Sequence, residues 1–252
     1  MNMFDGGNHG FSHQDHGATT PSTLRQPTPG VRRAVAPPSC EASPLLCHGR
    51  YRSDARLHRS NLTVDADSTR HVEGLPLYLS IRVYSTSTPS HAALAGVQIE
   101  LCHCDSQGRY SAPHMLEGAG RSWLRGHQFS DADGIVMFRT IYPGWQPGRA
   151  VHIHLGARYY DGFGHASFTY ATDLFFDDAV SDAVHARAPY ATHGVRDTRN
   201  GDDAWFAGCE DRRLQLRATG DHSPGYLGEI ALGLALAPSG EDTGAVLRYP
   251  TW

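Results

Sequence analysis

The stretch RAVHIHL, residues 149–155, predicts a β-strand that carries two histidines on one face. Apolar residues alternate with the histidines, and successive side chains of a strand point to opposite faces of its sheet. His152 and His154 therefore share a face, about 7 Å apart along the strand. Two imidazoles at that spacing can reach one metal ion, so the strand is both a core element and a candidate metal-binding element.

The same alternation recurs on both sides of this strand and predicts a mainly β protein. Strands are expected over residues 75–84, 97–101, 135–138, 151–155, 166–176, 214–216 and 226–236. Gly- and Asp-containing turns at 105–108 and 131–134 separate several of them. Helix-like spacing occurs only over 177–195, after an Asp-rich start. Many short strands with little helix indicate an antiparallel β-sandwich.

The chain is expected to form one folded domain with an N-terminal tail. Residues 1–39 are rich in Gly, His, Ser, Thr, Gln and Pro and lack a periodic apolar pattern, so we expect this tail to be disordered. The segment from 40 to 69 stays polar with isolated apolar residues and suits an extended arm laid on the core. Residues 40–252 are long enough to bury one sizeable core.

Composition narrows the classes of partner. A formal net charge of −4, without a basic cluster, gives no electrostatic reason to expect nucleic acid or an anionic membrane. The 5 cysteines are odd in number and lack paired CxxC spacing, which argues against a disulfide framework and a structural zinc site. Cys102 and Cys104 lie in a strand-like run and are expected to be buried. A small neutral or weakly acidic ligand fits this composition.

No segment resembles a membrane span or a signal peptide. The sequence contains no apolar run of the ~18 to 20 residues that a span needs. The pair Arg32-Arg33 is followed by AVAPP, which is too short and too rich in proline for the apolar part of a signal peptide. We therefore expect a cytoplasmic protein.

Seven phrases in order along residues 75–176 carry a resemblance to a known family. They are LAGVQIE (94–100), HCD (103–105), GRYS (108–111), LRG (124–126), DADG (131–134), FRTIYPG (138–144) and GRAVHIH (148–154). In these phrases the chain resembles the intradiol ring-cleavage dioxygenases, the group of protocatechuate 3,4-dioxygenase and catechol 1,2-dioxygenase. The resemblance implies the β-sandwich of that family with an extended N-terminal arm.

The resemblance also implies a cofactor and a ligand set. The family holds a non-haem Fe³⁺ with two tyrosinates and two histidines, and phenolate oxygen is a hard anionic donor that suits a trivalent ion. Residue by residue, Tyr110 matches the first tyrosine, and His152 and His154 match the two histidines. Arg149 matches the arginine that stabilises negative charge on the substrate, which makes it the candidate catalytic residue.

The chain departs from the family at three positions. Gln146 stands where the second tyrosine is expected, and its amide neither ionises nor accepts a proton near neutral pH. Asp173 stands where glutamine is usual, and a charge-assisted bond from Asp173 to Arg149 is expected. Cys102 stands where tryptophan is usual. Gln146 and Asp173 are the candidate substrate-binding residues, and Tyr142 is an alternative source of the missing phenolate.

Three functions follow from these residues. The first is an Fe³⁺-dependent intradiol dioxygenase that cleaves a catechol-type diol with O₂ to a muconate-type product, in aromatic compound catabolism. The second is a catalytically silent relative that keeps the sandwich as a binding module, because Gln146 replaces a ligand. The third is a divalent metal site with two histidines and an open position. An arm such as 40–69 can wrap its own core or reach a partner, so a homo-oligomer is compatible with the sequence.

Overall fold

The structure is a computed structural model in which five stretches are described. They are residues 57–65, 71–111, 121–161, 163–207 and 214–236. All of them belong to one structural unit, residues 34–252. The predicted tail 1–39 and residues 40–56 and 66–69 of the predicted arm lie outside the described residues. No helix of the described residues is long and apolar enough to cross a membrane.

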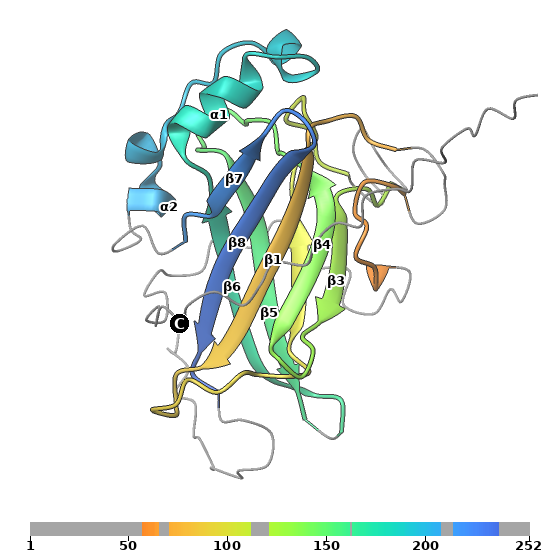
Figure 1. Ribbon diagram of the computed structural model, residues 1–252, viewed down its shortest axis with the longest axis vertical. Helices are drawn as coiled ribbons and strands as arrows, with labels where there is room; N and C mark the ends of the chain where they lie inside the picture. Colours follow the sequence, from red (N-terminus) through yellow and green to blue (C-terminus); the bar gives the residue numbers. More distant parts are fainter. Residues whose placement is uncertain (1–56, 66–70, 112–120, 162, 208–213, 237–252) are drawn as a thin grey trace, which may run out of the picture. The chain divides into compact units, whose positions relative to one another are not determined.

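Within the described residues, eight strands form two four-stranded sheets (Figure 1). One sheet has the order β4-β1-β8-β7, with β1 at Pro76–Ser85, β4 at Ile135–Ile141, β7 at Arg217–Asp221 and β8 at Gly225–Leu234. The other has the order β3-β2-β5-β6, with β2 at Gln98–Cys102, β3 at Arg125–Phe129, β5 at His152–Tyr160 and β6 at Ala166–Phe175. The predicted mainly β fold with little helix is confirmed.

All strand pairs but one are antiparallel among the described residues. The exception is the pair of β1 and β8, which run parallel from Leu77 opposite Tyr226 to Ser85 opposite Leu234. In the other sheet, β5 lies between β2 and β6. This register places His154 opposite Cys102 on one side and opposite Asp173 on the other. The neighbouring strands therefore bring these three side chains to the same part of the sheet.

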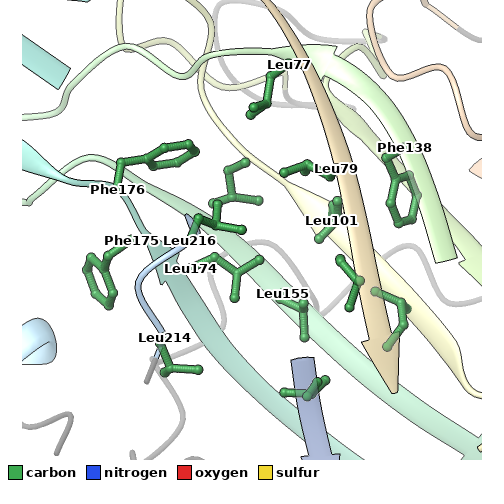
Figure 2. Packing of buried hydrophobic residues seen from close by; sticks show 14 of the residues in the cluster. Leu77, Leu79, Leu101, Phe138, Leu155, Leu174, Phe175, Phe176, Leu214 and Leu216 are labelled. Atoms are coloured by element: carbon green, nitrogen blue, oxygen red, sulfur yellow. The ribbon is translucent and has the colours of Figure 1, made fainter. Parts of the chain in front are cut away.

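The core lies between the two sheets and follows the predicted alternation (Figure 2). In β1, Leu77 and Leu79 are fully buried, as are Leu155 of β5 and Leu174 of β6. Burial of such a side chain stabilises the fold by about 1.5–3 kcal/mol. The strand that carries the two histidines is thus held rigidly by its apolar side chains. Cys102 and Cys104 are buried as well, as predicted.

The described part of the predicted arm, residues 57–65, lies on the core. Leu57 and Leu62 are buried, and single bridges pair His58 with His127 and Asn61 with Arg139. These contacts attach the arm to β3 and β4 without adding a regular strand. The expectation of an extended arm with little regular structure is confirmed for these residues.

Three elements differ from the sequence expectation. The helical pattern over 177–195 gives α1 at Asp178–His185 and, separately, a short 3₁₀ helix at Tyr190–His193. Pro189 precedes the second helix, and because proline lacks an N–H it cannot continue the first one. Strand β3 was not expected. The strand expected at 214–216 is wrong, since β7 begins at Arg217 and residue 215 makes only an isolated bridge.

Candidate metal centre

His152 and His154 occupy the beginning of β5, with both side chains almost fully buried. Their ring centroids are 4.7 Å apart, and the rings meet edge to face. The predicted pairing of the two imidazoles on one face of a strand is therefore present in the structure.

Each histidine uses its Nδ1 atom to bind an oxygen of the protein. His152 Nδ1 lies 2.7 Å from the carbonyl oxygen of Ala150, and His154 Nδ1 lies 2.6 Å from Oδ1 of Asp173. A carbonyl or carboxylate oxygen accepts hydrogen bonds, so both Nδ1 atoms donate. This leaves the Nε2 atom of each ring as the one that can bind a metal ion.

The Nε2 atom of His152 is buried and has no hydrogen-bond partner among the described residues. Burial, together with the neighbouring His154, lowers the pKa of His152 to about 4, so the ring is neutral near pH 7. A buried nitrogen with a lone pair and no partner is costly for a protein unless another group binds it. A metal ion is such a group.

Tyr110 reaches the same place from the loop after β2. Its hydroxyl oxygen lies 3.0 Å from Nε2 of His154. The loop is fixed by Asp105, whose carboxylate accepts the backbone N–H groups of Gln107 and Arg109. Gly108 completes the turn with a φ of 73°, a conformation that glycine adopts readily. A Cβ at this position would meet the carbonyl oxygen of Trp145 at 2.3 Å, so a larger residue does not fit.

The donor atoms brought together fit a metal ion. One phenol oxygen and two imidazole nitrogens converge, and a phenolate with imidazoles suits Fe³⁺. A second set overlaps with the first, since one ligand-type atom each of His152, His154 and Asp173 lies within 4.8 Å of the others. Both sets share the two histidines. Asp173, however, lies at Nδ1 of His154, on the other side of the ring from Tyr110, so the phenol is the third group on the Nε2 side.

Asp173 is buried on β6 and is held by two partners. Its Oδ1 binds His154, and its Oδ2 accepts a hydrogen bond from Arg149 at 2.7 Å. Burial alone would raise the pKa of this carboxyl, but the hydrogen bonds and charges of His154 and Arg149 lower it well below its usual range. Asp173 is therefore ionised, and the expected bond between Asp173 and Arg149 is present.

Arg149 lies between two carboxylates. Its second partner is Asp203, whose Oδ2 accepts from Arg149 Nε at 2.9 Å and from the backbone N–H of Ala150 at 2.8 Å. Burial opposes the charge of Arg149, whereas the hydrogen bonds and charges of Asp173 and Asp203 raise its pKa above the usual value. The guanidinium is thus fixed and permanently charged, with 21% of its side chain exposed.

Asp203 is a residue of the site that the sequence patterns did not predict. Its Oδ1 accepts the backbone N–H groups of Trp205 and Phe206, so the residue also caps the short helix α2 at Ala204–Ala207. An Asp at the start of a helix is a recognisable pattern. Its bond to Arg149, however, depends on a fold that brings residues 54 positions apart together.

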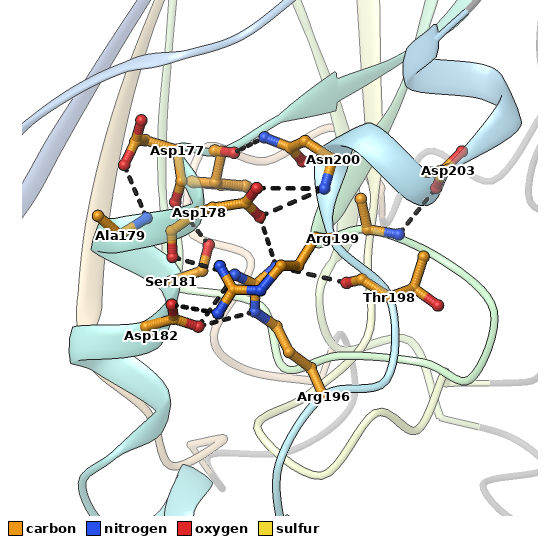
Figure 3. Close-up of polar contacts among 12 residues, drawn as sticks. Asp177, Asp178, Ala179, Ser181, Asp182, Arg196, Thr198, Arg199, Asn200 and Asp203 are labelled. Carbon is orange, nitrogen blue, oxygen red and sulfur yellow. Dashed lines mark hydrogen bonds and ion pairs between the residues drawn. The ribbon is translucent and has the colours of Figure 1, made fainter.

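The segment that carries Asp203 is fastened to α1 by a buried arginine (Figure 3). Arg196, whose side chain is only 3% exposed, donates to Asp178 at 2.5 Å and to Asp182 at 2.9 Å. Asn200 adds a bond from its side chain to the carbonyl oxygen of Phe176 at 2.7 Å. These bonds fix the backbone just before Asp203, which helps to hold that carboxylate against Arg149.

Gln146 lies on the loop before β5 and is half-buried. Its Nε2 donates to the carbonyl oxygen of Gly108 at 3.2 Å. The side chain is therefore directed at the turn that carries Tyr110, two residues further along the chain. The structure brings Gln146 next to this turn, and the contact with Gly108 connects the two loops on either side of the histidine pair.

Tyr142 does not join the cluster. Its ring is fully buried, its hydroxyl lies 2.9 Å from the hydroxyl of Ser181 on α1, and its ring packs on Phe176. Burial raises its pKa far above the usual value, so the phenol stays protonated. Tyr142 is a packing residue rather than the missing phenolate.

A cavity of about 550 Å³ adjoins the cluster through Tyr110, which lines it. The residues that line it also include Trp123, Gln107, Glu73 and Arg109. Arg109 is paired with Asp105 at 2.7 Å. His152, His154, Arg149 and Gln146 do not line this cavity, so Tyr110 is its one contact with the described cluster.

Comparison with known proteins gives matches only among solved structures, since no family model and no curated protein matches the sequence. The chain is similar to an intradiol ring-cleavage dioxygenase from Tetranychus urticae, with 22% identity and a TM-score of 0.64 over 82% of this chain and 98% of that one. It is also similar to the dioxygenase domain of a dioxygenase and carbohydrate-binding protein fusion from the cellulolytic bacterium Streptomyces sp. SirexAA-E. There the identity is 27% and the TM-score 0.50, over 71% of this chain and 89% of that one. The chain thus has the fold of the intradiol ring-cleavage dioxygenases, and the resemblance indicated by its sequence motifs is confirmed.

Proposed function

We propose that this protein is a non-haem Fe³⁺-dependent dioxygenase that cleaves the ring of a catechol-type aromatic diol with O₂. The observation that carries the proposal is the convergence of Tyr110 with His152 and His154 inside this fold. The phenol oxygen of Tyr110 lies 3.0 Å from Nε2 of His154, and Nε2 of His152 is buried beside them without a partner. The similar solved structures are named as dioxygenases, which supports the same reaction here.

The proposed roles follow from the chemistry of each side chain. Tyr110, His152 and His154 would hold the ion through one oxygen and two nitrogens. A bound Fe³⁺ supplies a site at which a catechol becomes electron-rich enough to react with O₂. The C–C bond between the two hydroxyl-bearing carbons breaks, and both oxygen atoms of O₂ enter the muconate-type diacid.

Arg149 is the proposed catalytic residue because it is the fixed cation next to the histidine pair. Its hydrogen bonds to Asp173 and Asp203 hold the guanidinium in one orientation, which avoids reorganisation when negative charge develops on the substrate. The two carboxylates also reduce the positive field that Arg149 presents. We therefore expect weaker stabilisation of an anion than a guanidinium without carboxylate partners would give.

Gln146 affects where the hydroxyl protons of a bound catechol can go. A catechol that binds through both oxygens releases its hydroxyl protons, and the amide of Gln146 cannot accept one near neutral pH. The reaction is therefore expected to proceed more slowly than with a phenolate at this position.

Oxygen consumption tests the proposal directly. The full chain is loaded with Fe³⁺ and mixed aerobically with catechol, 4-methylcatechol and protocatechuate, and both O₂ uptake and the ultraviolet absorption of a muconate product are followed. Uptake with product formation is expected, and the His152→Ala variant serves as the control without the histidine pair. Iron-loaded protein that consumes no O₂ with any of these diols would contradict the proposal.

A catalytically silent binding module is the second candidate, and Gln146 favours it because a ligand position carries a neutral amide. Tyrosinate bound to Fe³⁺ absorbs visible light, so the two candidates differ in colour. Purified protein that is colourless and free of iron in elemental analysis, and stays so after incubation with Fe³⁺, would favour the binding module.

A divalent metal site is the third candidate. His152 and His154 would supply the two nitrogen ligands of such a site, and an open position would complete it. Elemental analysis of the purified protein distinguishes this candidate from the first, because it would show a divalent metal in a protein that lacks the visible band of tyrosinate and Fe³⁺.

A further inference from the structure

Asp173 occupies a position at which the resemblance leads one to expect glutamine, and its place in the structure gives it a specific task. It lies directly opposite His154 in the pairing of β5 and β6, and its Oδ1 is 2.6 Å from Nδ1 of that ring. We propose that Asp173 supplies, through His154, negative charge at the iron in place of the tyrosinate that is missing at position 146. This inference rests on the proposed function, and Asp173 acts in it as a positioning residue.

The physical basis is the hydrogen bond between a carboxylate and a metal-binding imidazole. A carboxylate that accepts the Nδ1–H of such a ring fixes its tautomer and makes the opposite nitrogen a stronger donor. His154 has this arrangement, whereas Nδ1 of His152 binds the neutral carbonyl of Ala150. His152 would therefore be an ordinary imidazole ligand, whereas His154 would be a stronger donor because of the carboxylate behind it.

Arg149 and Asp203 hold Asp173 in this state. The hydrogen bond from Arg149 to Oδ2 fixes the carboxylate, so that Oδ1 remains directed at His154. Arg149 alone would offset the charge of Asp173, but Asp203 accepts from the same guanidinium at 2.9 Å. The group of one arginine and two aspartates has a net charge of −1, which leaves negative charge for His154 to transmit.

The contacts distinguish this task from direct binding of the metal by Asp173. Both carboxylate oxygens are engaged, one with His154 and the other with Arg149. The bond to His154 is at Nδ1, whereas Tyr110 lies at Nε2, the nitrogen on the other side of the ring. A metal ion at the phenol and the Nε2 atoms is therefore separated from Asp173 by the imidazole itself.

The test compares full-length wild type with Asp173→Asn and Asp173→Gln, each loaded with Fe³⁺. Three properties are measured: iron affinity by competition with a chelator, the wavelength of the visible tyrosinate band, and the Fe³⁺/Fe²⁺ reduction potential. We expect the affinity to fall by about 10- to 100-fold in both variants. The band should move to longer wavelength and the potential should rise, because a weaker donor leaves the ferric ion more electron-poor.

Asp202→Asn is the matched control, since it removes one negative charge from an exposed residue next to Asp203. It should leave all three properties unchanged. Asp203→Asn should shift the band and the potential in the same direction as the Asp173 variants but by less, because Arg149 then neutralises more of Asp173. This variant also decides the question if neither Asp173 variant folds.

The outcomes separate this inference from the proposed function. Wild-type protein that binds no Fe³⁺ would overturn both. Wild type with a visible tyrosinate band, but with Asp173 variants that keep its affinity, wavelength and potential, would overturn the role of Asp173 and leave the dioxygenase proposal standing. The same holds if Asp202→Asn shifts these properties as much as Asp173→Asn, since a general charge effect would then explain them.

Discussion

Arg149 and Asp203 are joined by a hydrogen bond of 2.9 Å from Nε to a carboxylate oxygen that also accepts the backbone N–H of Ala150. A single oxygen thereby fixes both the side chain and the backbone at the entrance to β5. The loop before the histidine strand is thus attached to the helical segment that contains α1 and α2. The position of the two histidines depends on this attachment as well as on the sheet.

Replacement of Arg149 by Met is expected to destabilise the protein strongly. The change leaves the buried carboxylates of Asp173 and Asp203 without their shared cation, and removal of one partner from a buried ion pair costs about 3–5 kcal/mol. Urea unfolding followed by tryptophan fluorescence measures this difference in the free energy of unfolding. Arg149→Lys retains the charge but not both hydrogen bonds, so its loss should be smaller.

Arg217→Met is the control for loss of an arginine, because Arg217 is exposed on β7. Its free energy of unfolding should stay within about 0.5 kcal/mol of wild type. Equal stabilities of the Arg149→Met and Arg217→Met variants would show that the two carboxylates do not need the guanidinium.

Replacement of Tyr110 by Phe is expected to remove the visible band of the iron-loaded protein while leaving the fold intact. The hydroxyl lies 3.0 Å from Nε2 of His154, and loss of such a bond changes the free energy of unfolding by about 1 kcal/mol. Absorption spectra with Fe³⁺ and unfolding curves without metal check the two parts separately. A visible band that persists in the variant would assign the colour to another phenolate.

Replacement of Gln146 by Tyr is expected to increase ring cleavage by about 100-fold or more, as expected for a group that accepts a proton during the reaction. The side chain at 146 is directed at the turn that carries Tyr110, so a phenol at this position would reach toward that turn. Gln146→Phe is the matched control, because it adds the ring without the hydroxyl. A similar gain in both variants would attribute the effect to the shape of the site rather than to the phenol.

Much of the fold could be predicted because the core strands present one apolar face. Leu77, Leu79 and Leu155 alternate with polar or smaller neighbours and lie in the core as expected. The two missed strands are at sheet edges. β3, with the sequence RGHQF, and β7, with RATGD, have no alternating apolar face, and β7 is largely exposed. Such strands are specified by their pairing partners, which a single sequence does not reveal.

Some residues of the candidate site could likewise be predicted from the sequence, and others could not. The approach of Tyr110 to His152 and His154 could be expected from the family resemblance that the motifs carry, and the bond between Arg149 and Asp173 from complementary charge. Asp203 could not, because it is the second of two consecutive aspartates in a loop. Its selection depends on where α2 begins and on the approach of that helix to β5, both of which are set by long-range packing.

His103 makes the stability of the metal-free protein fall in acid. The ring is fully buried, between the hydroxyl of Thr140 and the carbonyl oxygen of Cys104. Burial, together with the nearby His154 and His152, lowers its pKa from 6.5 to about 4, although the bond to Cys104 acts in the opposite direction. Between these values the unfolded chain binds a proton that the folded chain does not. The stabilising contribution of the neutral ring is therefore complete above about pH 6.5 and decreases as the pH falls toward 4.

The predicted loss between pH 7.5 and 4.5 is about 2–3 kcal/mol for this residue, because one pKa unit corresponds to 1.36 kcal/mol. Urea unfolding of chelator-treated wild type and His103→Gln at both pH values measures it. The variant is expected to be less stable at pH 7.5, since it lacks the bonds to Thr140 and Cys104, but to lose less on acidification. Contributions from other titrating groups, including His152, largely cancel in the difference between the two proteins. Equal losses in wild type and variant would mean that His103 takes up a proton in the folded protein as readily as in the unfolded chain, which the enclosed ring and its two occupied nitrogens argue against.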